Sequence, residues 1–272
     1  ADNRDSVANW IKCEFVRFGF ADVVLDSFIY QNTWQKNVVA TLPGSMMPER
    51  VFVYGGHHDS YSSGNPLTYA PGADDNASGT AAVLEMARVM KLKNYQPECT
   101  VKFITFAAEE YGLWGSKHFA DNAYNTGMDI RLMINHDMIS HKLSGTPPLV
   151  DINYYTGSDG FAGLAITSVI NYSNLSPTNG TPNSSGSDSY SFWQKGYNTV
   201  YFKEHDFSPF YHSPQDIISN NNMNFCSEVI KASGALLIAS NKMPSSVKNF
   251  RLYDTGHGQF ILANWNRNTE AD

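Results

Sequence analysis

The chain has 272 residues, of which 42% are hydrophobic, and a formal net charge of −7 at neutral pH. This length suits one large α/β domain, and the acidic balance argues against a nucleic-acid partner, because binding phosphate requires a basic surface. No run of about 18 apolar residues is present, so we expect no insertion into a membrane.

The first sixty residues predict one helix and several strands. Apolar residues recur at helical spacing over Ser6–Phe18. Phe28–Leu42 predicts two short strands that are separated at Asn32–Gln35, and Val51–Tyr54 predicts a further strand. Polar residues follow directly after this last strand.

Strands and helices alternate through the rest of the chain to about residue 240. The predicted elements are helix Ala77–Met90, strand Val101–Phe106, helix Leu113–Ala123, strand Leu132–Asn135, helices Phe161–Ile170 and Ser189–Trp193, strand Thr199–Phe202 and helix Phe225–Ala239. This alternation predicts an α/β fold, a three-layer αβα sandwich around a mostly parallel, mixed sheet. Ser173–Gly186 is rich in Ser, Asn and Gly and predicts a long surface loop.

The last thirty residues differ from the part before them. We expect one domain over residues 1–243 and a linker with a β-hairpin over 244–272, with strands at Val247–Tyr253 and Gln259–Trp265. The hairpin resembles the opening of a fibronectin type III sandwich, which would make it the start of a truncated domain. The alternative is an edge hairpin packed on the preceding domain.

Three cysteines lie far apart in the sequence, at Cys13, Cys99 and Cys226. An odd number cannot form a closed disulfide framework, so we expect small buried residues with at most one disulfide.

Acidic and imidazole side chains collect where the predicted strands end. Glu109 and Glu110 follow the apolar strand Val101–Phe106, and similar groups follow the other strands, at His57, Asp137 and His212. Adjacent carboxylates at the mouth of a buried strand are costly without a neighbouring positive charge. Because ligands bind at the carboxyl ends of strands in such sheets, the pattern predicts a metal site there.

Five sequence blocks carry a family resemblance over about Ser6–Lys242. They are GHHDS at 56–60, PGADDNASG at 71–79, AEEYGLWGS at 108–116, HDM at 136–138 and YHSPQD at 211–216. In this order, the blocks resemble those of the secreted bacterial aminopeptidases that use two co-catalytic zinc ions. The resemblance implies a zinc exopeptidase that hydrolyses peptides and is secreted or periplasmic.

The resemblance implies a ligand set for two Zn²⁺ ions. His57 and Asp137 would hold the first ion and Glu110 and His212 the second, while Asp75 would bridge them; the ligands are His57, Asp75, Glu110, Asp137 and His212. In the family, the peptide bond that follows the bridging Asp is usually cis. Such a shell of nitrogen and oxygen ligands suits zinc and leaves a position open for water.

The resemblance also implies catalytic roles. A water that bridges the metals would be the nucleophile, with Glu109 as its general base, and Asp59 would orient a ligand. Tyr211 would donate a hydrogen bond to the developing oxyanion, although it could equally be a packed aromatic residue. Glu109 and Asp137 would hold the free α-amino group of a substrate whose N-terminal residue is hydrophobic.

For several residues near these motifs, the sequence allows two different roles. We expect Asp74 to cap the helix that begins near Ser78 or to tune the charge of the site, and Asp188 to cap a helix or support a ligand. Ser189 stands where the family usually has His. Four aromatic residues form either a hydrophobic pocket or core: Phe192, Trp193, Phe207 and Phe210.

Three other functions share this fold. A glutaminyl cyclase-like acyltransferase would use one zinc, but those enzymes carry an insertion after the paired Glu that this chain lacks. Carboxypeptidases of the superfamily differ mainly in the group that recognises the substrate terminus. A non-catalytic binding domain would have lost the ligand set, which is complete here.

Overall fold

The computed structural model describes residues 3–244, 248–254, 256, 258 and 260–266. The chain divides into two compact units, residues 1–241 and residues 242–272. Within the described residues, no helix has both the length and the apolar character that a membrane span requires.

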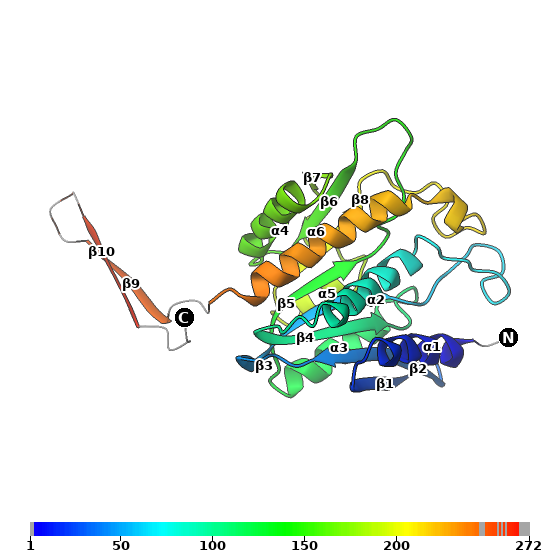
Figure 1. Cartoon of the computed structure of the whole chain (residues 1–272), viewed down its shortest axis with the longest axis horizontal. Coiled ribbons are helices and arrows are strands. Elements are labelled where there is room, and N and C mark those ends of the chain that lie inside the picture. Colours follow the sequence, from blue (N-terminus) through cyan, green and yellow to red (C-terminus); the bar gives the residue numbers. More distant parts are fainter. Residues whose placement is uncertain (1–2, 245–247, 255, 257, 259, 267–272) are drawn as a thin grey trace. The chain divides into compact units, whose positions relative to one another are not determined.

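The first unit is built on one eight-stranded sheet (Figure 1). Its strands are β1 (Asp22–Tyr30), β2 (Thr33–Leu42), β3 (Met47–His57), β4 (Cys99–Phe106), β5 (Asp129–His136), β6 (Leu149–Tyr154), β7 (Ser176–Asn179) and β8 (Thr199–Glu204), in the order β1-β2-β4-β3-β5-β8-β6-β7. The four central strands, β4, β3, β5 and β8, run parallel, whereas β1, β2 and β6 pair antiparallel with a neighbour. The mostly parallel, mixed sheet expected from the sequence is confirmed.

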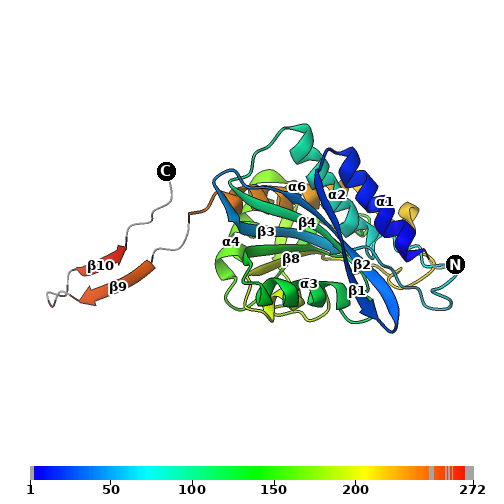
Figure 2. The same cartoon turned by 90° about the horizontal axis from the view of Figure 1, so that it is seen from below.

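Helices cover both faces of the sheet (Figure 2). They are α1 (Arg4–Arg17), α2 (Ala77–Leu92), α3 (Trp114–Asn125), α4 (Asp159–Tyr172), α5 (Ser189–Trp193) and α6 (Met223–Asn241), with a short 3₁₀ helix at Ile218–Asn220. Successive side chains of a strand point to opposite faces. Phe52 and Tyr54 therefore pack into a core with α1, α2, α4 and α6, while Val51 and Val53 pack with α3 and α5.

The first hairpin turns earlier than expected. Gln31 and Asn32 both have positive φ, as a two-residue hairpin turn with the right twist requires. Trp34 is therefore inside β2 and pairs with Ile29 of β1, so the predicted break at Asn32–Gln35 was wrong.

The segment Ser173–Gly186 is not entirely loop, which corrects a second prediction. It contains β7, which pairs parallel with β6, and β6 was also missed from the sequence. β7 has four residues, includes Pro177 and lies at the edge of the sheet. Proline is tolerated there because an edge strand has amide groups that need no partner strand.

The cysteines differ from the expectation in one respect. Cys99 and Cys226 are buried, but Cys13 is exposed, and all three are free thiols. No disulfide therefore joins them.

The second unit contains an antiparallel hairpin of β9 (Lys248–Asp254) and β10 (Ile261–Asn266). The rings of Phe250 and Trp265 lie 6.4 Å apart across it. Val247 and Gln259, which were expected to begin these strands, lie outside the described residues. The fibronectin-like continuation stays a prediction.

Helix α2 approaches the sheet so closely that its first turn requires glycine. A Cβ added at Gly79 would lie 2.2 Å from the main-chain oxygen of His136, which ends β5. The same addition at Gly163, in α4, would meet no atom within 4 Å. The two helical glycines therefore differ only in their surroundings.

We predict opposite effects for Gly79→Ala and Gly163→Ala. The first should lower the free energy of unfolding by about 1–3 kcal/mol, because backbone must shift to admit the methyl group. The second should raise it by about 0.5–1 kcal/mol, since alanine is the better helix former. Urea denaturation measures both, and equal effects would contradict the close approach.

Candidate metal centre

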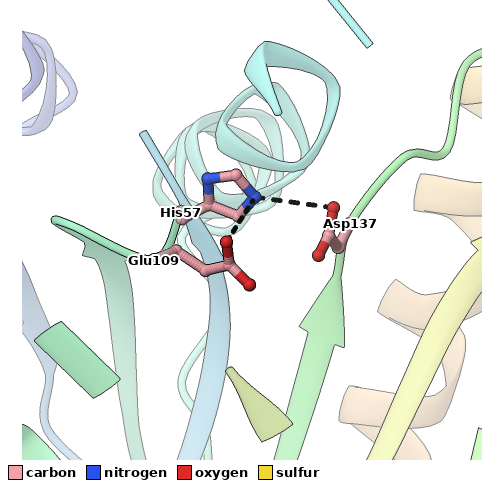
Figure 3. Close-up of side chains that lie close together, drawn as sticks. All are labelled: His57, Glu109 and Asp137. Atoms are coloured by element: carbon pink, nitrogen blue, oxygen red, sulfur yellow. Dashed lines mark ion pairs between the residues drawn. The ribbon is translucent and has the colours of Figure 1, made fainter. Parts of the chain in front are cut away.

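The expected site residues meet at one edge of the central sheet. In the strand register, His57 at the end of β3 lies beside Phe106, the last residue of β4, and β5 runs parallel on the other side of β3. Glu109 follows β4 closely and Asp137 follows β5 directly. Three adjacent parallel strands thus deliver one side chain each to the same place (Figure 3).

The side chains form two groups, each able to hold a cation. In the first, His57 Nε2 lies 3.5 Å from Asp137 Oδ1 and 3.9 Å from Glu109 Oε2. The second consists of Asp75, Glu110 and His212. His212 Nε2 lies 2.7 Å from Glu110 Oε2. Within each group the potential ligand atoms all lie within 4.8 Å of one another.

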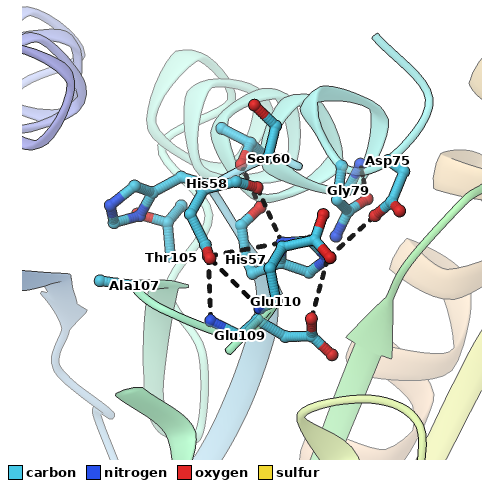
Figure 4. Close-up of polar contacts among 12 residues, drawn as sticks. His57, His58, Ser60, Asp75, Gly79, Thr105, Ala107, Glu109 and Glu110 are labelled. Atoms are coloured by element: carbon cyan, nitrogen blue, oxygen red, sulfur yellow. Dashed lines mark hydrogen bonds and ion pairs between the residues drawn. The ribbon is translucent and has the colours of Figure 1, made fainter. Parts of the chain in front are cut away.

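Asp75 connects the two groups. Its Oδ1 lies 3.3 Å from His57 Nε2 (Figure 4). Its Oδ2 lies 3.2 Å from His212 Nε2. Each oxygen thus faces a different imidazole, which is the arrangement that a bridging carboxylate needs. The peptide bond between Asp75 and Asn76 is cis, as the family resemblance implies.

The backbone beside the site adopts unusual conformations. Ala108, Met138 and His212 have φ between 51° and 57°, the left-handed region that residues other than glycine rarely enter. Ala108 precedes the paired glutamates and Met138 follows Asp137. Such conformations cluster at functional sites, where the surrounding structure holds them in place.

Asp59 links the first histidine to the paired glutamates. Its main-chain oxygen lies 3.0 Å from His57 Nδ1, and its carboxylate lies 3.6 Å from the same atom. The two carboxylate oxygens accept the main-chain N–H groups of Glu109 and Glu110, at 3.1 and 3.2 Å. Asp59 therefore fixes both the imidazole and the turn that carries the glutamates.

The electrostatics of the site fit divalent cations. Burial raises the pKa of Glu109 well above its usual value, and the charge of Asp137 adds to this effect. Burial and Asp75 raise the pKa of Glu110 to about 7. Among the described residues, His57 Nε2 and Glu110 Oε1 are buried without a hydrogen-bond partner. Imidazole nitrogens and carboxylate oxygens in groups of three are a donor set that suits zinc.

Aromatic rings flank His212 on the open side of the site. The ring of Tyr211 is stacked on His212 with 3.7 Å between centroids, and Tyr61 contacts His212 edge-on. Tyr211 is 41% exposed, so it is not a core residue. Phe207 packs against Tyr211 and is also exposed, whereas Phe192 of α5 is fully buried against Phe106 and Phe119.

Asp74 does not cap helix α2, which corrects that interpretation. Asn76 is the cap, and its side-chain oxygen accepts the N–H of Gly79. Asp74 Oδ1 instead accepts both the N–H and the hydroxyl of Ser140, at 2.8 and 2.7 Å. It thereby joins the start of α2 to the segment that follows Asp137.

Asp188 precedes α5, but its side chain makes no capping hydrogen bond. It is fully buried, and burial raises its pKa to about 7. Ser189, which replaces the usual His, shares a hydrogen bond of 2.7 Å with the hydroxyl of Tyr155. The replacement therefore leaves the two ligand groups intact.

A family model matches residues 37–236, which is most of the chain and includes every candidate ligand. The chain belongs to peptidase family M28. This confirms the resemblance to zinc exopeptidases that the motifs indicated.

Comparisons with known proteins agree with this assignment. A probable zinc metalloprotease of Pyrenophora teres f. teres is 46% identical over 107 residues, which are 38% of this chain and 22% of that protein. LapA aminopeptidase of Legionella pneumophila is 20% identical with a TM-score of 0.79, over 90% of this chain and 66% of its own. A zinc aminopeptidase of Bacillus subtilis is 25% identical with a TM-score of 0.63, over 78% and 51%. The chain therefore spans less than a quarter of the first relative, and the likeness to LapA confirms the fold.

Two acids near the M28 site received no role from the sequence. Glu204, at the end of β8, accepts the main-chain N–H of His141 through Oε2 and that of Ser208 through Oε1, at 2.7 and 2.9 Å. Asp216 accepts the main-chain N–H groups of Asp74 and Asp75 in a similar way. Burial, together with the charge of Asp74, raises the pKa of Glu204 to about 11. The position of Glu204 at a strand end was the only signal in the sequence that pointed to a role for it.

We predict that Glu204 makes stability depend on pH. Its pKa in the folded protein lies above the ordinary value of 4.5, so its contribution is fully present below pH 4.5 and is lost as the pH rises toward 11. From pH 5 to 9, the wild type should therefore lose stability relative to Glu204→Gln, as chemical denaturation at each pH would show.

Glu228→Gln is the control for this experiment. The hydrogen bond from Lys231 lowers the pKa of Glu228, so its contribution is lost only as the pH falls through that lowered value. The difference from the wild type should stay flat between pH 5 and 9. A flat difference for Glu204→Gln as well would show that Glu204 is ionised when folded.

Proposed function

We propose that this chain is a co-catalytic di-zinc aminopeptidase that hydrolyses the N-terminal peptide bond of peptides. The observation that carries the proposal is the position of Asp75, whose two oxygens face His57 and His212. Each histidine also has a carboxylate of its own, Asp137 for the first and Glu110 for the second. Two ions that share Asp75 would complete both groups.

The residues divide into ligands and proton carriers. A bound pair of zinc ions would supply an activated water and polarise the scissile carbonyl. Glu109 would take the proton of the attacking water and deliver it to the leaving amine, since its raised pKa favours uptake of a proton. The hydroxyl of Tyr211, next to a ligand, would donate a hydrogen bond to the developing oxyanion.

The surroundings favour a hydrophobic N-terminal residue in the substrate. Ring contacts run from Tyr61 through His212 and Tyr211 to Phe207, and Phe207 is more than half exposed. Glu109 and Asp137 lie on the deeper side and would bind the free α-amino group. Only one residue would then fit between the bound α-amino group and the scissile bond, so cleavage would release the first residue of the peptide.

The rival functions make different demands on the site. A glutaminyl cyclase-like acyltransferase needs one zinc, and a non-catalytic binding domain needs none. The second complete group, formed by Asp75, Glu110 and His212, favours the two-zinc enzyme over both.

Metal content and hydrolysis together test this proposal. The wild type should bind two zinc ions and release p-nitroaniline from leucine p-nitroanilide, but not from the N-acetylated compound. Glu110→Gln should retain one ion, because it alters the second group alone, whereas Asp75→Asn should weaken both. One zinc with cyclisation of N-terminal glutamine would identify a cyclase, and no zinc with no turnover would identify a binding domain.

We predict that Glu109→Gln lowers kcat by about 100- to 10,000-fold, the usual contribution of a general base. Its metal content should stay at the wild-type level, because the amide keeps the size and one oxygen of the carboxylate. This control matters because Glu109 Oε2 lies within the first group. Loss of one zinc in Glu109→Gln would show that Glu109 is a ligand rather than the base.

A further inference from the structure

Asp216 binds three consecutive amide groups of the segment that carries Asp75. Its Oδ1 accepts the N–H of Asp74 at 2.8 Å and its Oδ2 accepts that of Asp75 at 3.0 Å. Its main-chain oxygen accepts the N–H of Ala73 at 3.0 Å. Asp216 is only 3% exposed, so little water competes for these bonds.

Asp216 also follows His212 by four residues and is tied to its turn. Its own N–H donates to the main-chain oxygen of Ser213, the residue after His212. The ligands Asp75 and His212 come from segments that are far apart in the sequence, and Asp216 is a direct connection between those segments. Moving either segment would break several of these hydrogen bonds.

The arrangement repeats the one made by Asp59. Asp59 follows His57 by two residues and binds the amides of two consecutive acids, Glu109 and Glu110. Asp216 follows His212 and binds the amides of two consecutive acids, Asp74 and Asp75. Each histidine segment thus carries an aspartate that holds the backbone of the carboxylate ligands facing it.

We propose that Asp216 is a positioning residue that holds the bridging carboxylate of Asp75 at its place between the two metal ions. The carboxylate of Asp216 is not one of the candidate metal ligands. It acts through hydrogen bonds to the backbone of Asp74 and Asp75. This inference rests on the proposed two-zinc function. The segment that carries His212 would then have two roles: it supplies a ligand and it holds the backbone of Asp75.

The role requires a carboxylate, because two amide N–H groups point at two oxygens. In Asp216→Asn, the side-chain NH₂ would face one of these N–H groups, so one hydrogen bond is lost and two donors oppose each other. In Asp216→Ala both are lost. Residues that support metal ligands in this way typically contribute about 10- to 100-fold to metal affinity.

Zinc affinity, measured by competition with a chelator, tests the proposal in the whole chain. Asp216→Asn should weaken zinc binding about 10- to 100-fold, and Asp216→Ala at least as much. Asp206→Asn is the matched control. Asp206 also accepts a main-chain N–H, from Leu143 at 3.1 Å, but in a segment without ligands. The zinc affinity of Asp206→Asn should equal that of the wild type.

The zinc affinity of the folded variants, and not their melting temperature, separates positioning from a purely structural role. Unchanged zinc affinity in folded Asp216→Asn, whatever its melting temperature, would overturn the proposal while leaving the two-zinc enzyme intact. A wild type without zinc would overturn both.

If Asp216→Asn does not fold, hydrogen exchange of the wild type provides the test. Zinc should protect the amides of residues 73–75 together with those of residues 213 and 215–217, because Asp216 joins the two segments. Protection of 73–75 alone would overturn the proposal.

Discussion

The shared carboxylate of Asp75 is the contact on which the rest of the site depends. Its two oxygens reach two imidazoles that come from opposite ends of the domain's sequence, His57 and His212. Gathering buried carboxylates around it is unfavourable unless each is stabilised. Two buried acids beside it, Asp59 and Asp216, are stabilised because the carboxylate of each accepts two main-chain N–H groups. The acids are thus held by backbone that the fold has already ordered.

Residues with left-handed backbone conformations explain how neighbouring side chains can point to different ligand groups. Glu109 and Glu110 are adjacent, yet one faces His57 and the other His212. Ala108, with φ of 57°, ends the extended course of the chain after β4 and begins the turn that separates them. Met138 does the same after β5, so that Asp137 points into the site while the chain turns away toward Ser140. Backbone that is costly elsewhere is here the means of directing ligands.

The sequence predicted those parts of the structure that are local. Strand–helix alternation gave the layers, and acids at strand ends gave the positions of Glu109, Glu110 and Asp137, because parallel strands end at a common edge. The role of Asp216 could not be predicted in the same way. Its hydrogen bonds to Asp74 and Asp75 join residues 142 and 141 positions apart, and no sequence motif predicts contacts over such a separation. The capping role of Asp74 was wrong for a similar reason, since its partner Ser140 lies 66 positions away. β7 was missed because its four residues, three polar residues and a proline, lack the alternation of a strand.

The unequal exposure of the two groups bears on how a peptide would be cleaved. His57 is 1% exposed, whereas the side chain of His212 is 27% exposed and lies beside the open ring of Tyr211. Under the proposed function, a substrate would approach over the second group. The first group is bounded by Glu109 and Asp137, whose charges suit a small cation such as an α-amino group and exclude a continuing, uncharged chain. Under the proposed function, cleavage at the chain terminus follows from the depth and charge of the first group, and the choice of side chain from the rings beside the second.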